Sequence, residues 1–288
     1  MTAGDDHKRL ALPPVYVAAR RILLDALVAL EAHREAVIVA GAQAIYLRTG
    51  EADFGIAPFT TDADLALNPK QLGGDPTLPQ AMIAAGFSLR VKADGHVDPG
   101  TWEASTRVAD KSFTIPVDLI VPEAVAPPGG RRGARLGVHG REAAKRAVGL
   151  EAALIDQSPM QIAALEPSDA RTVEAKVAGP AALMIAKAHK IHDRIGDSRR
   201  DRTEDKDAAD VFRLMQTTNP AEIRGVFALL LESSPAQSAT ADAMKHLDAL
   251  FGRLGRPGIA MATRSLTAAV PEARISAICV AYIDELLR

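Results

Sequence analysis

The hydrophobic pattern of this chain changes near residue 179, and this change constrains the fold more than any other feature. Before about residue 122, short apolar runs typical of strands alternate with segments of helical spacing. From Gly179-Pro180 onward the spacing is helical almost throughout, and proline favours the first turn of a helix. We therefore expect an α+β protein, in which a mixed sheet with flanking helices precedes a mainly α-helical C-terminal domain.

Turn-forming residues divide the chain into three expected parts. Residues 1–125 form a first domain, and Pro127-Pro128-Gly129-Gly130 interrupts its pattern. Residues 126–178 are expected as a linker with short strands that complete the core, and residues 179–288 as the helical domain. Helices are predicted at residues 14–33, 42–47, 78–86, 180–195, 205–217, 219–232, 236–254, 257–269 and 271–287. Strands are predicted at residues 37–40, 60–67, 87–91, 101–108, 113–121 and 172–177, with Pro116 marking an edge or a bulge.

The composition is that of a globular protein and excludes several classes. Hydrophobic residues make up 48% and charged residues 24%, which excludes disorder along the whole chain. The net charge is −2, so any contact with nucleic acid must come from a local patch. The single cysteine, Cys279, cannot form an internal disulfide, and the longest apolar run, residues 36–47, is short of the roughly 20 residues that a membrane span needs. We expect a cytoplasmic protein with no membrane partner.

Three aspartates in predicted strands form the most informative pattern. Polar and apolar residues alternate over residues 60–67, so Asp62 and Asp64 would point to the same face of a strand. Asp118 lies in an otherwise apolar strand, where a buried carboxylate needs a partner. If the two strands are neighbours, the three carboxylates converge on one or two metal ions, and Mg²⁺ prefers such oxygen ligands. The alternative is that these acids lie at strand ends and are solvated.

A strand, a glycine turn and a helix start are predicted over residues 39–44. The free N–H groups of a helix N-terminus form a natural phosphate site, and Gly41 lets the backbone approach a phosphate closely. Gly41 and Ala42 are therefore candidate phosphate-binding residues. In the simpler interpretation, Gly41 only forms a turn between a strand and a helix.

Two basic segments follow. Lys187, Lys190 and Arg194 share one face of the first C-terminal helix, and Asp207 and Asp210 lie one turn apart on the next helix. Lys187 could pair with triphosphate oxygens, and Asp210 could hold that lysine or a base edge. The alternative is a solvated helical face whose ion pairs are weak.

The second basic segment lies within residues 131–146. Its basic side chains could hold an RNA backbone, although a solvated loop explains them equally well. They are Arg131, Arg132, Arg135, Arg141, Lys145 and Arg146.

Together these motifs resemble the polymerase-β-like nucleotidyltransferase superfamily. The matching residues are Gly41-Ala42 before a helix, Thr60-x-Asp62-x-Asp64, and Asp118. The basic helix, followed by Lys206-Asp207-Ala208-Ala209-Asp210-Val211, is similar to the helical motif of AbiEii-type nucleotidyltransferases, which include the MenT-like toxins of toxin–antitoxin systems. The resemblance covers roughly residues 36–216. The chain departs from the family at Ala42, where glycine or serine is usual, and at Ala57-Pro58-Phe59, where an arginine is often found.

The resemblance implies a metal-dependent enzyme that transfers a nucleoside monophosphate from an NTP to an acceptor, with residues 1–125 as the catalytic domain. Asp62, Asp64 and Asp118 would hold two Mg²⁺ ions. Lys187 would neutralise the triphosphate, and Asp210 would orient Lys187 or the base. The residues implied in nucleotide binding are Gly41, Ala42, Thr61, Lys190 and Arg194.

Similarity to the MenT-like group implies the 3′ end of a tRNA as the acceptor, action as a toxin, and a cognate antitoxin protein as a partner. Two alternatives stay open. The acceptor could be a small molecule or a protein hydroxyl, or the chain could be a catalytically inactive nucleotide-binding or interaction module.

Overall fold

The computed structural model describes residues 12–50, 59–129, 132–195 and 202–288. The strands are β1 (Val37–Ala40), β2 (Ala63–Leu67), β3 (Ser88–Val91), β4 (Val97–Val108), β5 (Lys111–Pro122), β6 (Lys145–Ala147), β7 (Gln157–Ala163) and β8 (Thr172–Ala178). The α-helices are α1 (Pro14–Ala29), α2 (Gly41–Thr49), α3 (Leu78–Ala84), α4 (Pro180–Arg194), α5 (Arg202–Thr217), α6 (Pro220–Leu231), α7 (Gln237–Phe251), α8 (Pro257–Leu266) and α9 (Glu272–Leu287). The protein is thus of the mixed α/β class.

The strands belong to one mixed sheet with the order β3-β4-β5-β2-β1-β8-β7, and β6 pairs with β5 outside this row. Strand β2 runs antiparallel to β1 and parallel to β5. Strand β8 runs parallel to β1, so residues 172–178 join the sheet next to its first strand. Strands from distant parts of the chain therefore lie together at the centre of the sheet.

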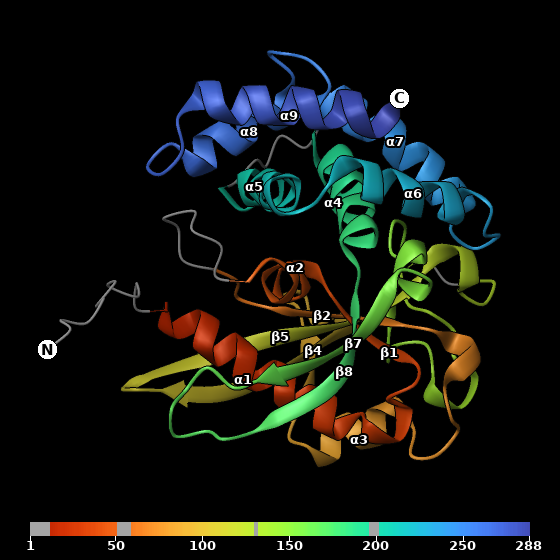
Figure 1. Cartoon of the computed structure of the whole chain (residues 1–288). Coiled ribbons are helices and arrows are strands. Elements are labelled where there is room, and N and C mark those ends of the chain that lie inside the picture. The colour runs from red at the N-terminus through yellow and green to blue at the C-terminus, as the bar shows by residue number, and fades with distance from the viewer. Residues whose placement is uncertain (1–11, 51–58, 130–131, 196–201) are drawn as a thin grey trace, which may run out of the picture.

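Helices surround this sheet unequally (Figure 1). Helix α1 contacts β2, β4, β5 and β8 across one face, whereas α5 to α9 form a separate layer above the sheet. Helix α2 follows β1 and lies between the sheet and α4 and α5. One continuous cluster of buried hydrophobic residues extends through both parts. Within the described residues, no helix combines the length and the apolar character that crossing a membrane requires.

Three local predictions need correction. The first helix ends at Ala29, and residues 31–33 form a separate 3₁₀ turn. Strand β2 begins only at Ala63, the first residue that pairs with β5, so Asp62 precedes the strand. Strand β5 lies between β4 and β2 and is not an edge strand. The first pair that β5 makes with β2 is at Val117, one residue after Pro116. Among the described strands, only β4 therefore runs beside Pro116. The missing N–H of the proline is tolerated there because no second strand needs it.

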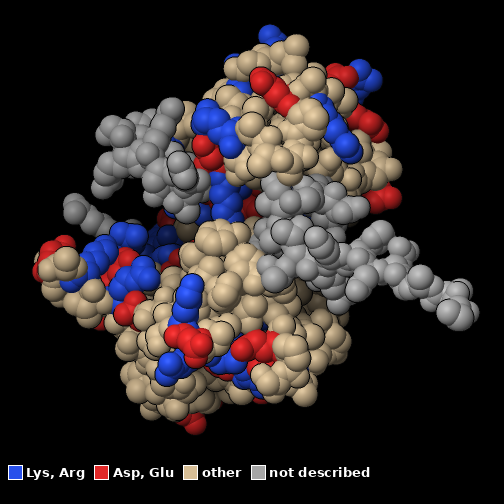
Figure 2. Space-filling view, turned by 90° about the vertical axis from the view of Figure 1, so that its left-hand side faces the viewer, with Lys and Arg blue, Asp and Glu red and all other residues tan. Residues whose placement is uncertain are grey.

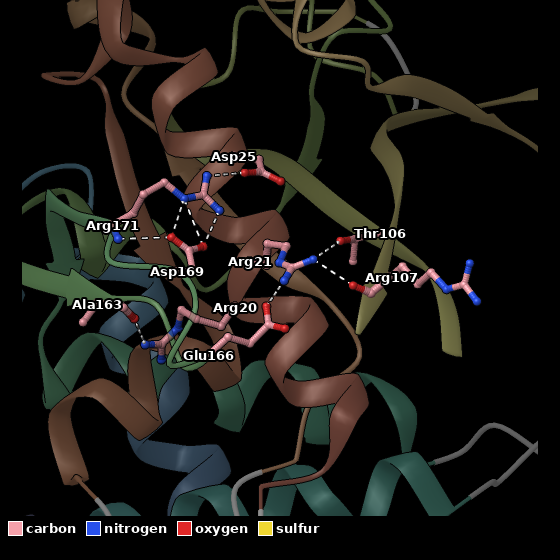
Figure 3. A network of polar contacts seen from close by, with 9 residues as sticks. All are labelled: Arg20, Arg21, Asp25, Thr106, Arg107, Ala163, Glu166, Asp169 and Arg171. Carbon is pink, nitrogen blue, oxygen red and sulfur yellow. Dashed lines mark hydrogen bonds and ion pairs between the residues drawn. The ribbon is translucent and has the colours of Figure 1, made fainter. Parts of the chain in front are cut away.

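A polar network holds α1 against the ends of two hairpins (Figure 3). It joins Arg20, Arg21 and Asp25 of α1 to Thr106, Arg107, Ala163, Glu166, Asp169 and Arg171. Arg20 also donates from Nε to Oε1 of Gln43 at 2.9 Å. Because Gln43 lies in the first turn of α2, this bond fixes α2 relative to α1 and the sheet.

Candidate functional site

Two aspartates meet at the centre of the sheet. Asp64 of β2 is in register with Asp118 of β5, and the strands are parallel neighbours. Asp62 lies just before β2. Burial, together with the negative charges of Asp62 and Asp118, raises the pKa of Asp64 to about 6. The expectation that the two strands are neighbours is therefore confirmed. Convergence of the three carboxylates on a metal ion stays a prediction.

Gly41 is packed against Asp64. It has a φ of +64°, and a Cβ built on it would lie 1.9 Å from Asp64 Oδ2. A side chain at this position would therefore displace the carboxylate and strain the backbone. Gly41 also begins α2, whose N-cap is Ala40, so no side chain of the N-cap residue takes up the first N–H groups of the helix. Binding of a phosphate there, by Gly41 and the buried Ala42, stays a prediction.

Two carboxylates of the cluster have partners that hold them in place. Thr60 Oγ1 donates to Asp62 Oδ1 at 2.5 Å. Thr101 Oγ1 donates to Asp118 Oδ1 at 2.7 Å, and Lys145 Nζ lies 2.5 Å from Asp118 Oδ2. Both oxygens of Asp118 thus have a partner.

The sequence patterns did not single out Thr101, and Lys145 appeared only as one member of a basic segment. Thr101 is directly opposite Asp118 in the β4–β5 pairing, and Lys145 is opposite Ile120 in the β5–β6 pairing. Both positions follow only from strand register, which no local pattern reports.

Lys187 of α4 is a buried ion-pair centre. Its Nζ lies 2.5 Å from Asp207 Oδ1 and 2.7 Å from Asp210 Oδ2, and the residue is 4% exposed. Burial alone would lower the pKa of Lys187, but the two carboxylates raise it well above its ordinary value. The predicted pairing of Asp210 with Lys187 is present in this geometry. The contact predicted between Lys187 and a triphosphate would require these ion pairs to open.

Two partly exposed cations of α4 lie around Asp207. Lys190 and Arg194 lie 3.2 and 3.5 Å from Asp207, on its Oδ1 and Oδ2, and keep 40% and 45% of their side-chain surface. The charge of Lys190 also acts on Asp64 and lowers its pKa. Figure 2 shows Lys and Arg side chains gathered at the narrow zone between the helical part and the sheet part on the face that it draws. The helical part therefore presents positive charge toward the carboxylates.

Lys206 and Tyr46 lie between the acidic cluster of the sheet and the ion pairs of Lys187. The sequence patterns assigned neither residue a role. Burial lowers the pKa of Lys206, whereas the charges of Asp210 and Asp62 oppose that shift. Its ammonium lies 5.7 Å from the ring centre of Phe59. Tyr46 of α2 donates to the Phe59 carbonyl at 2.9 Å and to Asp210 Oδ1 at 3.3 Å.

Some candidates lie apart from this cluster or outside the described residues. Thr61 is exposed beside Asp62. The basic segment is not one surface, because Arg146 pairs with Glu123 and Lys145 with Asp118. Arg131 and Ala57-Pro58 lie outside the described residues. A hollow of about 780 Å³ lies elsewhere, between the end of α1 and strands β7 and β8, and none of the candidate residues lines it.

The acidic cluster fits a hard divalent cation by its chemistry, although it is not a preformed cage. Nowhere among the described residues are three or more His, Cys, Asp or Glu side chains already arranged around a metal position. Carboxylate oxygens are nevertheless the ligands that Mg²⁺ prefers. The pKa of Asp64 is raised by burial and also by repulsion from Asp62 and Asp118, and a bound cation would relieve this repulsion.

The sequence matches no protein-family model and no curated protein. Function is therefore inferred from the fold and the geometry of the site.

Proposed function

We propose that this protein is a metal-dependent nucleotidyltransferase, which transfers a nucleoside monophosphate from an NTP to an acceptor hydroxyl. The observation that carries the proposal is the register of Asp64 with Asp118, opposite the cations of α4 and α5. Carboxylates that hold a divalent cation, together with cations that surround a triphosphate, are the recurrent parts of phosphoryl-transfer sites.

Asp62, Asp64 and Asp118 are the residues that would hold Mg²⁺. When bound there, the cation supplies charge stabilisation for the attacking and leaving oxygens of an in-line displacement at the α-phosphate. The acceptor oxygen forms a bond to the α-phosphorus while the bond from that phosphorus to the oxygen bridging to the β-phosphate breaks. The hydroxyl proton passes to solvent, and pyrophosphate leaves with the electron pair of the broken bond.

The remaining residues bind and position the substrate. Lys190 and Arg194 are half-exposed, and the charge of Lys190 acts on Asp64, so we assign both to the triphosphate. The first turn of α2, at Gly41 and Ala42, offers N–H groups to the same phosphates. Lys187 is buried between two carboxylates, so its role here is to hold Asp207 and Asp210 in place rather than to touch the nucleotide.

Resemblance to the MenT-like group supports a tRNA 3′ end as the acceptor, with action as a toxin and an antitoxin partner. The competing proposals keep the same site but use a small-molecule or protein hydroxyl, or have no transfer activity. The proposals differ in which acceptor molecule becomes labelled by the transferred nucleotide.

The test is incorporation from each of the four α-³²P-labelled NTPs, with tRNA, total protein and an aminoglycoside as separate acceptors. Asp62→Asn with Asp64→Asn conserves shape and removes the charge, whereas Asp242→Asn, an exposed acid of α7, is the control. We expect label in tRNA with the wild type and the control, and a loss of at least about 100-fold in the double variant. Incorporation that survives in the double variant overturns the metal-dependent mechanism. Nucleotide binding with no labelled acceptor favours an inactive binding module.

A further inference from the structure

We infer that Lys145 takes the place of a second metal ion at Asp118, so that each chain binds one divalent cation, at Asp62 and Asp64. The inference rests on the proposed function and changes the number of metal ions that the family resemblance implies from two to one. It makes Lys145 a positioning residue, which holds Asp118 beside the cation site.

The Lys145–Asp118 contact is close and shielded from solvent. Lys145 Nζ lies 2.5 Å from Asp118 Oδ2, and the two side chains keep only 18% and 19% of their surface. Thr101 donates to the other oxygen, Asp118 Oδ1, at 2.7 Å. A shielded ion pair of this kind is much stronger than an exposed one, because water screens it less.

Asp64 differs from Asp118 in this respect. Among the described residues, no hydrogen bond or ion pair reaches the Asp64 carboxylate within bonding distance, although it is in register with Asp118. The sheet therefore holds one carboxylate with a cation at contact distance, and a neighbouring one on which the charges of Lys190 and Lys145 act only from farther away. A divalent cation would compensate the charge of Asp64, whereas at Asp118 it would compete with Lys145.

The backbone around Lys145 is built to hold it there. Lys145 pairs with Ile120 of β5 and bridges to Gly133. Gly100 has a φ of +73°, and a Cβ on it would lie 2.2 Å from the backbone nitrogen of Lys145. This close approach allows β6 to lie against β4, directly beside Thr101. The close approach at Gly100 thus fixes the backbones of Thr101 and Lys145, the two partners of Asp118, relative to each other.

The positive charge of Lys145 opposes a second divalent cation at Asp118. A second divalent cation on Asp118 would lie within a few ångströms of the ammonium, where like charges repel strongly in a poorly hydrated site. Its binding would therefore require Lys145 to leave Asp118.

The test counts bound Mn²⁺ by the electron paramagnetic resonance signal of the free ion, using the full-length chain without nucleotide. We expect one Mn²⁺ per wild-type chain and two per chain of Lys145→Met, which removes the competing ammonium and keeps the length of the side chain. Lys111→Met, at the exposed start of β5, is the matched control and should bind one. Circular dichroism checks folding, and Lys145→Gln replaces the first variant if that variant is misfolded.

Two Mn²⁺ ions per wild-type chain, or one in both the wild type and a folded Lys145 variant, would overturn the inference, as would no binding at all. Nucleotidyl transfer is measured separately on the same preparation. A wild type that transfers nucleotide and binds two ions keeps the proposed function and rejects the role of Lys145. A wild type that binds one ion and transfers nothing rejects the proposed function and leaves the cation count in place.

Discussion

Asp64 is in register with Asp118 on the neighbouring parallel strand, and with Ala40 on the antiparallel strand at its other side. The residue after Ala40 is Gly41, whose backbone packs against the Asp64 carboxylate. One position of β2 thus brings together the acidic cluster and the start of α2. Any change at this point affects the carboxylates and the helix N-terminus at once.

Gly41→Ala is expected to lower the free energy of unfolding by more than about 2 kcal/mol and to weaken Mn²⁺ binding. The new Cβ combines the strain of a positive φ with a clash against Asp64 Oδ2. Urea denaturation and Mn²⁺ titration measure the two effects.

Gly50→Ala is the matched control for this substitution. Gly50 has the same φ of +64°, but a Cβ there meets nothing within 4 Å. Gly50→Ala should therefore lose only the stability that the strained backbone conformation costs, about 1–3 kcal/mol, and should bind Mn²⁺ normally. Equal losses in the two variants would mean that the contact with Asp64 contributes nothing.

Lys187→Met is expected to destabilise the protein by about 3–5 kcal/mol, because it leaves Asp207 and Asp210 buried without their central cation. Lys190→Met removes an exposed partner of the same Asp207 and should cost less than about 1 kcal/mol. Chemical denaturation of both variants checks the difference. Similar stabilities would show that Lys187 is not the structural centre of this ion-pair group.

Lys190→Gln is expected to raise the dissociation constant for NTP about tenfold, since a charge-assisted hydrogen bond contributes about 1.5–3 kcal/mol. Isothermal titration with a non-hydrolysable NTP analogue measures the constant. Lys176→Gln, which removes a lysine that pairs with Glu35 away from the cluster, should leave the constant unchanged. An unchanged constant in Lys190→Gln would remove this residue from the nucleotide site.

Histidines at the α4–α7 contact make stability depend on pH. The His246 ring stacks on His192 with centroids 3.7 Å apart and meets His189 edge-on at 5.0 Å. Burial, followed by the charges of His192 and His189, lowers the pKa of His246, while Asp242 and Asp193 oppose the shift. The folded state therefore favours the neutral ring. Its contribution to stability is complete above the ordinary histidine pKa of about 6.5 and is lost as the pH falls below it.

His246→Phe keeps an aromatic ring in the stack but does not titrate. Between pH 7 and pH 5 the melting temperature should fall less in this variant than in the wild type, as scanning calorimetry would measure. His96→Gln, at an exposed histidine, is the control and should follow the wild type. A variant that loses as much stability as the wild type would place the pH dependence elsewhere.

Local patterns predicted the helical part well. The helices expected at residues 205–217 and 271–287 are α5 (Arg202–Thr217) and α9 (Glu272–Leu287). Helical periodicity and the prolines at helix starts are local signals, so they can be read without knowing which segments pack together. The start of β2 was misplaced because a strand begins where its partners do, and β5 lies far along the chain.

The sequence by itself determined most of the order of strands and helices, the candidate aspartates and the basic helix, because residue type and spacing carry this information. It did not predict β6 and β7. Only the tertiary structure decided that Thr101 and Lys145 hold Asp118 and that Lys187 is buried between Asp207 and Asp210. These contacts depend on strand register and on the packing of α4 against α5. Both are set by burying hydrophobic surface over the whole molecule, which no short segment of sequence records.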